Sequence, residues 1–177
     1  MMTVFKWLGI ALAAIIVVIG LVLGGMRFSD GPKAILAGGP FKTGEYADTP
    51  DDWNFLKGRP EIEFQTIAPS TSRIVWLAVI DGRLFIVSGY MNTNYGKIWK
   101  QWPSYLAEDD RIILRIDGKL YEQRLERLLE FSDLVELMGI FKAKYGVEIA
   151  TEVSAAALDE GLKNGDFWLF EVVERQE

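Results

Sequence analysis

The sequence IVWLAVIDGRLFIVS occupies residues 74–88 and predicts a β-hairpin. Residues 74–80 form a dense apolar run, which is typical of a strand buried on both faces. Asp81-Gly82 separates this run from a second predicted strand at residues 83–88. Because both central positions of a type I′ turn need a positive φ, Asp-Gly between two apolar runs is the strongest short hairpin signal.

A second hairpin of the same kind follows further along the chain. Asp117-Gly118 lies between predicted strands at residues 111–116 and 119–128. Upstream, residues 61–66 (EIEFQT) alternate apolar and polar side chains, as a half-buried strand does. Two hairpins and a flanking strand predict an antiparallel sheet that closes into a small β-barrel.

Helices are predicted at the periphery of this barrel. Asp133 is placed to begin one helix, with Glu136 forming a capping box, and Gly146 ends it. A second helix covers residues 154–163, and residues 166–174 form a closing strand. The predicted fold class is therefore mainly β with peripheral helices (α+β).

Two shorter helices are predicted before these. Residues 97–106 form one, in which Pro103 marks a kink or a restart. The other begins inside a Gly/Pro-rich connector at residues 29–60, with Thr49 as the N-cap and Pro50 at the first helical position. We expect Trp53 and Phe55, which follow, to pack onto the domain.

The N-terminus is unlike the rest of the chain. Residues 7–26 carry no charge and are bounded by Lys6 and Arg27. About 20 apolar residues cross a bilayer as a helix, and Trp7 suits the membrane interface. A cleaved signal peptide is the alternative, although its apolar region is usually about 7–15 residues long. We expect residues 7–26 to remain uncleaved and to cross the lipid bilayer once as a helix.

The predicted organisation has three parts: an anchor at residues 1–28, the connector at residues 29–60 and the barrel domain at residues 61–177. Basic residues are nearly balanced on the two sides of the anchor, with Lys6 before it and Arg27 and Lys33 after it. The expected orientation places the short tail inside and the domain outside.

Composition excludes several classes of chemistry. The 177 residues include no Cys and no His. Disulfides, thiolate nucleophiles, a His general base and a Ser-His-Asp triad are therefore excluded, and no metal site is expected. The formal charge of −6 argues against nonspecific nucleic-acid binding.

Aromatic and basic residues gather between the two hairpins. Trp99 and Trp102 share one face of a helix. They either pack into the core or form a stacking wall for a planar ligand. Lys97 and Lys100 lie beside them, where they could meet a phosphate.

Four arginines alternate with acidic residues along the second hairpin. They are Arg111, Arg115, Arg124 and Arg127, with Glu122 and Glu126 between them. Cross-strand ion pairing is the preferred interpretation, and an anion site is the alternative.

Three stretches of the chain resemble the flavin-binding split β-barrel superfamily. They are residues 64–66 (FQT), 70–73 (STSR) and 76–88 (WLAVIDGRLFIVS). The continuation WPSYLAEDDRI, residues 102–112, is similar to a passage of its deazaflavin-dependent nitroreductase branch. The pyridoxamine-phosphate-oxidase-like branch has the same order of strands, and the connector resembles that of membrane-anchored, uncharacterised bacterial members.

The resemblance spans about residues 61–128 and implies a split β-barrel that binds FMN, or alternatively a deazaflavin, as a homodimer. Arg73 stands in the turn that matches the family's basic turn, and Trp102 is the family-matched neighbour of the flavin ring. Lys97 and Lys100 are further candidates for the phosphate, Tyr90 for the ring face, and Ser88 and Asn92 for the ring edge. The predicted cofactor-binding residues are thus Arg73, Ser88, Tyr90, Asn92, Lys97, Lys100 and Trp102, and no catalytic residue is predicted.

Two functional hypotheses follow. The first is a flavin- or deazaflavin-dependent oxidoreductase anchored in the bacterial inner membrane, with its domain on the periplasmic side, acting on quinone-like or nitro-aromatic acceptors. The cofactor would carry the redox chemistry, which explains how a site without His or Cys could be an enzyme. The alternative is a non-catalytic, membrane-tethered binding or assembly module that kept the barrel and lost the cofactor.

Overall fold

The computed structural model describes residues 2–89, 91, 101–146 and 154–175. Its strands are β1 (Glu45–Tyr46), β2 (Glu61–Thr66), β3 (Thr71–Trp76), β4 (Ala78–Ile80), β5 (Arg83–Gly89), β6 (Arg111–Ile116), β7 (Lys119–Leu128) and β8 (Phe167–Glu174). They form one sheet in the order β3-β2-β6-β7-β8-β5-β4, with β1 paired to β7. Every pair is antiparallel except β1 with β7.

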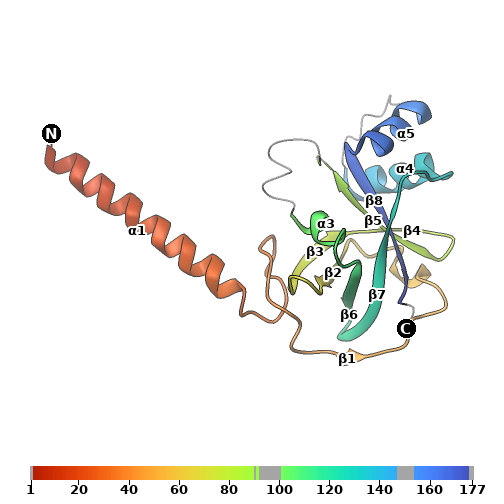
Figure 1. Cartoon of the computed structure of the whole chain (residues 1–177), viewed down its shortest axis with the longest axis horizontal. Coiled ribbons are helices and arrows are strands. Elements are labelled where there is room, and N and C mark those ends of the chain that lie inside the picture. Colours follow the sequence, from red (N-terminus) through yellow and green to blue (C-terminus); the bar gives the residue numbers. More distant parts are fainter. Residues whose placement is uncertain (1, 90, 92–100, 147–153, 176–177) are drawn as a thin grey trace.

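The sheet curls into a half-barrel because its two edges are consecutive in the chain. β3 forms one edge and β4 the other, and Leu77 alone separates them. The chain therefore passes directly from one edge to the other, and β3 meets β5 across the opening (Figure 1). The single strand predicted at residues 74–80 is thus wrong: the apolar run is broken at Leu77 into two strands.

A tyrosine satisfies the backbone at this break. The hydroxyl of Tyr145 accepts a hydrogen bond from the Leu77 N–H at 2.9 Å and lies 2.8 Å from the Leu77 carbonyl oxygen. Leu77 itself is fully buried. Since buried backbone groups need partners, this contact replaces the ladder bonds that the break removes.

Both predicted hairpin turns are confirmed. Asp81 and Gly82 have φ values of 49° and 77°, and Asp117 and Gly118 have values of 51° and 78°. The strands beside the second turn, and β2, begin and end at the predicted residues. The predicted fold class is also confirmed: an antiparallel half-barrel with peripheral helices, preceded by one apolar helix.

Two cores lie on opposite faces of the sheet. The inner core fills the half-barrel with side chains such as Phe64, Leu114 and Phe170. The outer core lies between the sheet and two helices, α4 (Leu134–Tyr145) and α5 (Ala155–Asn164), which gather at one end of the molecule (Figure 1). Both helices end at a glycine in the left-handed conformation, Gly146 and Gly165.

Three local predictions about the helices differ from the structure. Asp133 is the N-cap of α4, but its side chain makes no capping bond, so the predicted capping box is absent there. The connector helix is a 3₁₀ turn at Asn54–Leu56, not a helix begun by Thr49. Of the two aromatic residues expected to pack, Trp53 is buried, whereas Phe55 is 55% exposed.

The predicted helix at residues 97–106 is described only in part. α3 (Trp102–Tyr105) is a single turn, and Pro103 lies at its start, where a missing N–H costs no hydrogen bond. Residues 97–100 lie outside the described residues.

The N-terminal helix α1 (Met2–Met26) stands apart from the sheet (Figure 1). Its segment Phe5–Met26 has a mean hydropathy of 2.8, and this apolar segment is not buried in the protein. This helix is long and apolar enough to cross a membrane, a property that it shares with signal sequences near an N-terminus.

Candidate ligand-binding site

A cavity of about 430 Å³ lies where the end of α1 meets the open edge of the half-barrel. Its walls come from the end of α1 and the residue after it (Leu23, Arg27), the connector (Ile35 to Gly38), β3 (Thr71, Arg73, Ile74) and α3 with its N-cap (Gln101, Trp102, Tyr105). This volume is within the range of about 300–1,000 Å³ that ligand pockets occupy. Three regions that are far apart in the sequence, residues 23–38, β3 and α3, therefore build one site.

Arg73 is the most unusual side chain in this cavity. Its Nε atom is buried and has no hydrogen-bond partner, and Arg73 forms no ion pair within the described part of the chain. Burial lowers the pKa of Arg73 to about 10, an effect that the nearby Tyr105 partly offsets. The guanidinium is still protonated at neutral pH, so an unpaired positive charge lies in a largely desolvated position.

Strand register explains why Arg73 points inward. Arg73 is directly opposite Phe64 of β2, and opposite residues of an antiparallel pair share one face of the sheet. Phe64 is fully buried in the inner core. The side chain of Arg73 therefore enters the edge of the half-barrel instead of turning to solvent.

The charge of the cavity is positive. Arg27, directly after α1, is a second arginine in its wall, and none of its described lining residues is acidic. In a chain with a formal charge of −6, this local excess of positive charge favours an anionic ligand.

Trp102 contributes to the cavity but belongs mainly to the core. Its ring lies 5.1 Å from Phe64 and 5.4 Å from Phe170, measured between centroids, and the residue is 5% exposed. Of the two interpretations of this residue, the geometry favours core packing. Tyr105, which is less buried, donates a hydrogen bond from its hydroxyl to Gln101 Oε1 at 2.9 Å.

The structure brings together two of the predicted cofactor-binding residues, Arg73 and Trp102. Ser88 is buried on β5, where its Oγ contacts Met91 Sδ at 3.3 Å, and it is not part of the cavity wall. Four further candidates lie outside the described residues: Tyr90, Asn92, Lys97 and Lys100.

Most residues of the cavity were not predicted as site residues from the sequence, among them the charged Arg27 and the aromatic Tyr105. Arg27 was interpreted as the boundary of the apolar run and as part of the charge balance across it, because nothing local shows that the connector folds back against α1. Tyr105 precedes Leu106 in the predicted helix, and its place beside Arg73 depends on how α3 packs on β3.

Three arginines of the second hairpin form ion pairs, but with other partners than the predicted Glu122 and Glu126. Arg115 bonds Glu63 of the neighbouring β2, Arg124 bonds Asp110, and Arg111 bonds Asp109 two residues away, whereas Glu122 pairs with Arg175. Arg127 lies over the ring of Trp168, with 3.7 Å from Cζ to the ring centroid. The alternative of a shared anion site on this hairpin is therefore not favoured.

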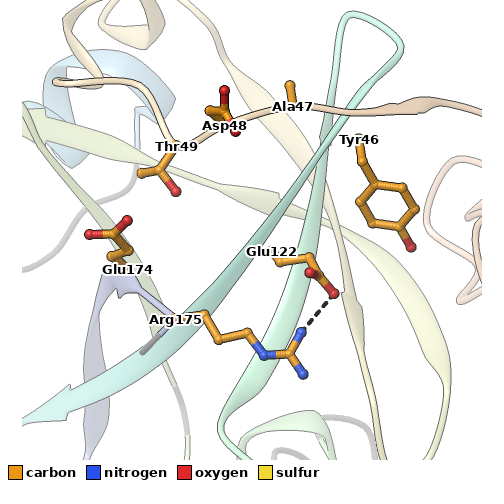
Figure 2. A pocket seen from close by; sticks show the side chains of 7 residues that line it. All are labelled: Tyr46, Ala47, Asp48, Thr49, Glu122, Glu174 and Arg175. Carbon is orange, nitrogen blue, oxygen red and sulfur yellow. Dashed lines mark hydrogen bonds and ion pairs between the residues drawn. The ribbon is translucent and has the colours of Figure 1, made fainter. Parts of the chain in front are cut away.

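A larger cavity of about 690 Å³ lies between β1 and the ends of β7 and β8 (Figure 2). Asp48, Glu122 and Glu174 line it, and Arg175 pairs with Glu122 at 2.7 Å. This negative excess would repel an anionic ligand. Within the described residues, no three or more acidic side chains are grouped so that they could hold a metal ion. The cavity at α1 is therefore the better candidate for the predicted ligand.

Comparisons with known proteins give likenesses of fold only. No protein-family model matches the chain, and no curated protein matches it significantly. The conserved hypothetical protein Rv2991 from Mycobacterium tuberculosis is similar in structure, with a TM-score of 0.46 and 14% identity over 73% of this chain and 86% of that one.

Two other solved structures are similar at a comparable distance. HutZ, the heme storage protein from Vibrio cholerae, has a TM-score of 0.43 and 11% identity over 70% of this chain and 87% of its own. An FAD-binding protein from Mesorhizobium loti has a TM-score of 0.39 and 11% identity over 68% of this chain and 85% of its own. At this distance the likenesses assign no ligand to this chain.

Proposed function

We propose that this chain is a membrane-anchored protein that binds an anionic, aromatic cofactor of the flavin type in the cavity beside α1. The observation that supports the proposal is the buried, unpartnered Nε of Arg73. A guanidinium matches a phosphate with parallel hydrogen bonds, and phosphate supplies the negative charge that the cavity lacks. Arg27 adds a second positive charge to the same wall.

The residues present fit the phosphate end of FMN better than its ring. Arg73 and Arg27 can hold a dianion, and no described lining residue opposes them. Since Trp102 packs on Phe64 and Phe170, Tyr105 and the aliphatic side chains of Leu36 and Ile74 remain to contact a flat ring. A deazaflavin with a phosphate-bearing tail is the alternative cofactor.

A bound flavin would supply electron or hydride transfer, which a chain without His or Cys cannot otherwise perform easily. The role of this chain would be to hold the phosphate and to position the acceptor. Leu23, from the apolar helix, lines the cavity, so a quinone-like or nitro-aromatic acceptor dissolved in lipid would reach it from the membrane. The proposal includes a homodimer in a bacterial inner membrane, with the domain on the periplasmic side.

A non-catalytic binding or assembly module remains the second candidate. The observation that favours it is the packing of Trp102, which is 5% exposed and so offers little surface on which a ring could stack. In that case the cavity would hold an anion without redox chemistry.

A comparison of FMN with riboflavin tests the proposal. The two ligands share the ring and differ in the phosphate, so purified full-length protein should bind FMN about 10–100-fold more tightly, the range expected for one or two charge-assisted hydrogen bonds. Arg73→Met should remove this preference and leave riboflavin binding unchanged. Both affinities are measured by quenching of flavin fluorescence.

Arg111→Met is the matched control, because Arg111 is an exposed arginine paired with Asp109 outside the cavity. It should retain the preference for FMN. A colourless protein that binds neither FMN nor a deazaflavin would contradict the first candidate and favour the non-catalytic module.

A further inference from the structure

A tight turn projects from the connector directly after α1. Lys33 and Leu36 exchange two backbone hydrogen bonds, Lys33 N–H to Leu36 O at 3.1 Å and Leu36 N–H to Lys33 O at 3.0 Å. Ala34 has a positive φ of 51°, a conformation that is unfavourable for a residue with a Cβ. Ile35 occupies the other central position of the turn and is 87% exposed.

The exposure of Ile35 is imposed by the fold around it. Gly38, two residues after the turn, exchanges backbone hydrogen bonds of 2.8 and 3.1 Å with Ser72 of β3. A Cβ at Gly38 would lie 1.8 Å from the Gly31 carbonyl oxygen, so the two arms of this loop are in close contact. The loop is therefore fixed to the barrel, and its apolar tip cannot turn inward without breaking these contacts.

Exposed apolar side chains concentrate beside the end of α1. Among the described residues that follow α1, Ile35 and Phe28 are the most exposed large apolar side chains, at 87% and 79%. Ile35 also shares a cavity wall with Leu23 and Arg27. Since Leu23 belongs to the uncharged part of α1, the tip of the turn lies beside the last turns of that helix.

The charges near this tip are positive. Arg27 directly precedes Phe28, and Lys33 precedes Ile35 by two residues. The one acidic residue between them, Asp30, is directed to the barrel, where it bonds Arg115 at 2.7 Å and accepts a hydrogen bond from Thr43 Oγ1. A surface with apolar tips and unopposed basic residues has the composition of a contact with anionic lipid.

We propose that the turn at residues 33–36 is a second membrane contact, in which Ile35 enters the bilayer surface beside α1 while Lys33 meets lipid phosphates. The occupant of this surface is the same bilayer that α1 crosses. The contact fixes the domain with the cavity of Arg73 at the membrane surface. The inference depends on α1 lying in a bilayer and is independent of the ligand that the cavity takes.

Site-specific fluorescence tests this contact, and the absence of cysteine from the chain makes it practical. Single variants Ile35→Cys, Leu21→Cys and Tyr46→Cys, each at an exposed side chain, are labelled with an environment-sensitive dye in the full-length protein. The labelled proteins are placed in phosphatidylcholine–phosphatidylglycerol vesicles with and without spin-labelled lipid. The label at Ile35 should show a blue-shifted emission and should be quenched by spin-labelled lipid to an extent comparable with Leu21 and several times more than Tyr46.

The two reference sites make each outcome decisive. If Leu21 is quenched and Ile35 behaves like Tyr46, α1 lies in the bilayer but the turn does not contact it, and the inference is wrong. If Leu21 is not quenched, α1 is not in the bilayer and the inference fails with it. Because no flavin is present, neither result bears on the proposed cofactor.

Discussion

Two arginines of the same sheet have opposite environments. Arg115 on β6 donates hydrogen bonds from Nε to Glu63 at 2.6 Å and from Nη1 to Asp30 at 2.7 Å. Its guanidinium also lies 4.3 Å from the ring centroid of Phe41. Arg73 on β3, with only β2 between the two strands, has a buried Nε without a partner.

The two pKa shifts express this difference. Burial acts to lower the pKa of Arg115, but the hydrogen bonds to Glu63 and Asp30 raise it overall. Burial lowers the pKa of Arg73 to about 10, and Tyr105 offsets this only in part. The folded state therefore favours a charged Arg115 and disfavours a charged Arg73. A fully partnered guanidinium stabilises the fold, whereas an unpartnered one is available to a ligand.

Removal of Arg115 should have the largest effect on stability. Arg115→Met leaves Glu63 and Asp30 without this partner and removes one of the contacts between the connector and the barrel, so the free energy of unfolding should fall by about 3 kcal/mol. Urea unfolding of the full-length protein in detergent, followed by tryptophan fluorescence, measures this change.

Arg111→Met is the control for this experiment, because Arg111 is exposed and its ion pair with Asp109 is local. Its effect should be within about 0.5 kcal/mol. Equal effects of the two substitutions would show that the contacts of Arg115 stabilise the fold no more than an exposed ion pair does.

The partners of Arg115 could not be predicted from the sequence, although much of the sheet could. Asp81-Gly82 and Asp117-Gly118 form the predicted turns because their positive φ values are a local requirement of a two-residue hairpin. By contrast, Asp30 and Arg115 are separated by 85 residues. Their pairing depends on how the connector crosses the barrel, which no local pattern records.

The break at Leu77 and most of the candidate site could not be predicted for the same reason, since both depend on tertiary packing. Residues 74–80 are uniformly apolar, so periodicity cannot locate a break that tertiary closure and Tyr145 determine. Arg73 was predicted because a family resemblance marked the residues around it as a basic turn, but Arg73 lies in β3. Its burial could not be predicted because that depends on its register with Phe64. Arg27 and Tyr105 reach the cavity only through the packing of α1 and α3.

A smaller effect is expected at Asp30, and it should depend on pH. The backbone N–H of Lys42, then the hydroxyl of Thr43 and the guanidinium of Arg115, hold the pKa of Asp30 well below its usual range. Asp30→Asn should lower the free energy of unfolding by about 1–2 kcal/mol at pH 7. Because the folded-state pKa is depressed, the contribution of this carboxylate is present above the unfolded-state value of about 4 and declines as the pH falls below it.

Urea unfolding of the wild type and Asp30→Asn at pH 7 and pH 3 measures this dependence, and the difference between the two proteins should be smaller at pH 3. The control is the same substitution in the Arg115→Met background, where it should cost less because one partner is already missing. A difference that is constant with pH would contradict the role assigned to the charged carboxylate.

The smallest effect, and the one of opposite sign, is expected at Arg73. Arg73→Met removes a buried charge that has no partner in the described residues and substitutes an apolar side chain of similar length, so the free energy of unfolding should rise by about 1 kcal/mol. The same urea measurement on full-length protein tests this, with inorganic phosphate added in a second series. Phosphate should stabilise the wild type, because an anion that binds only the folded state adds its binding free energy to stability, and it should not stabilise Arg73→Met. A loss of stability as large as that of Arg115→Met would mean that Arg73 holds the fold together as Arg115 does, and the contrast between the two arginines would then be wrong.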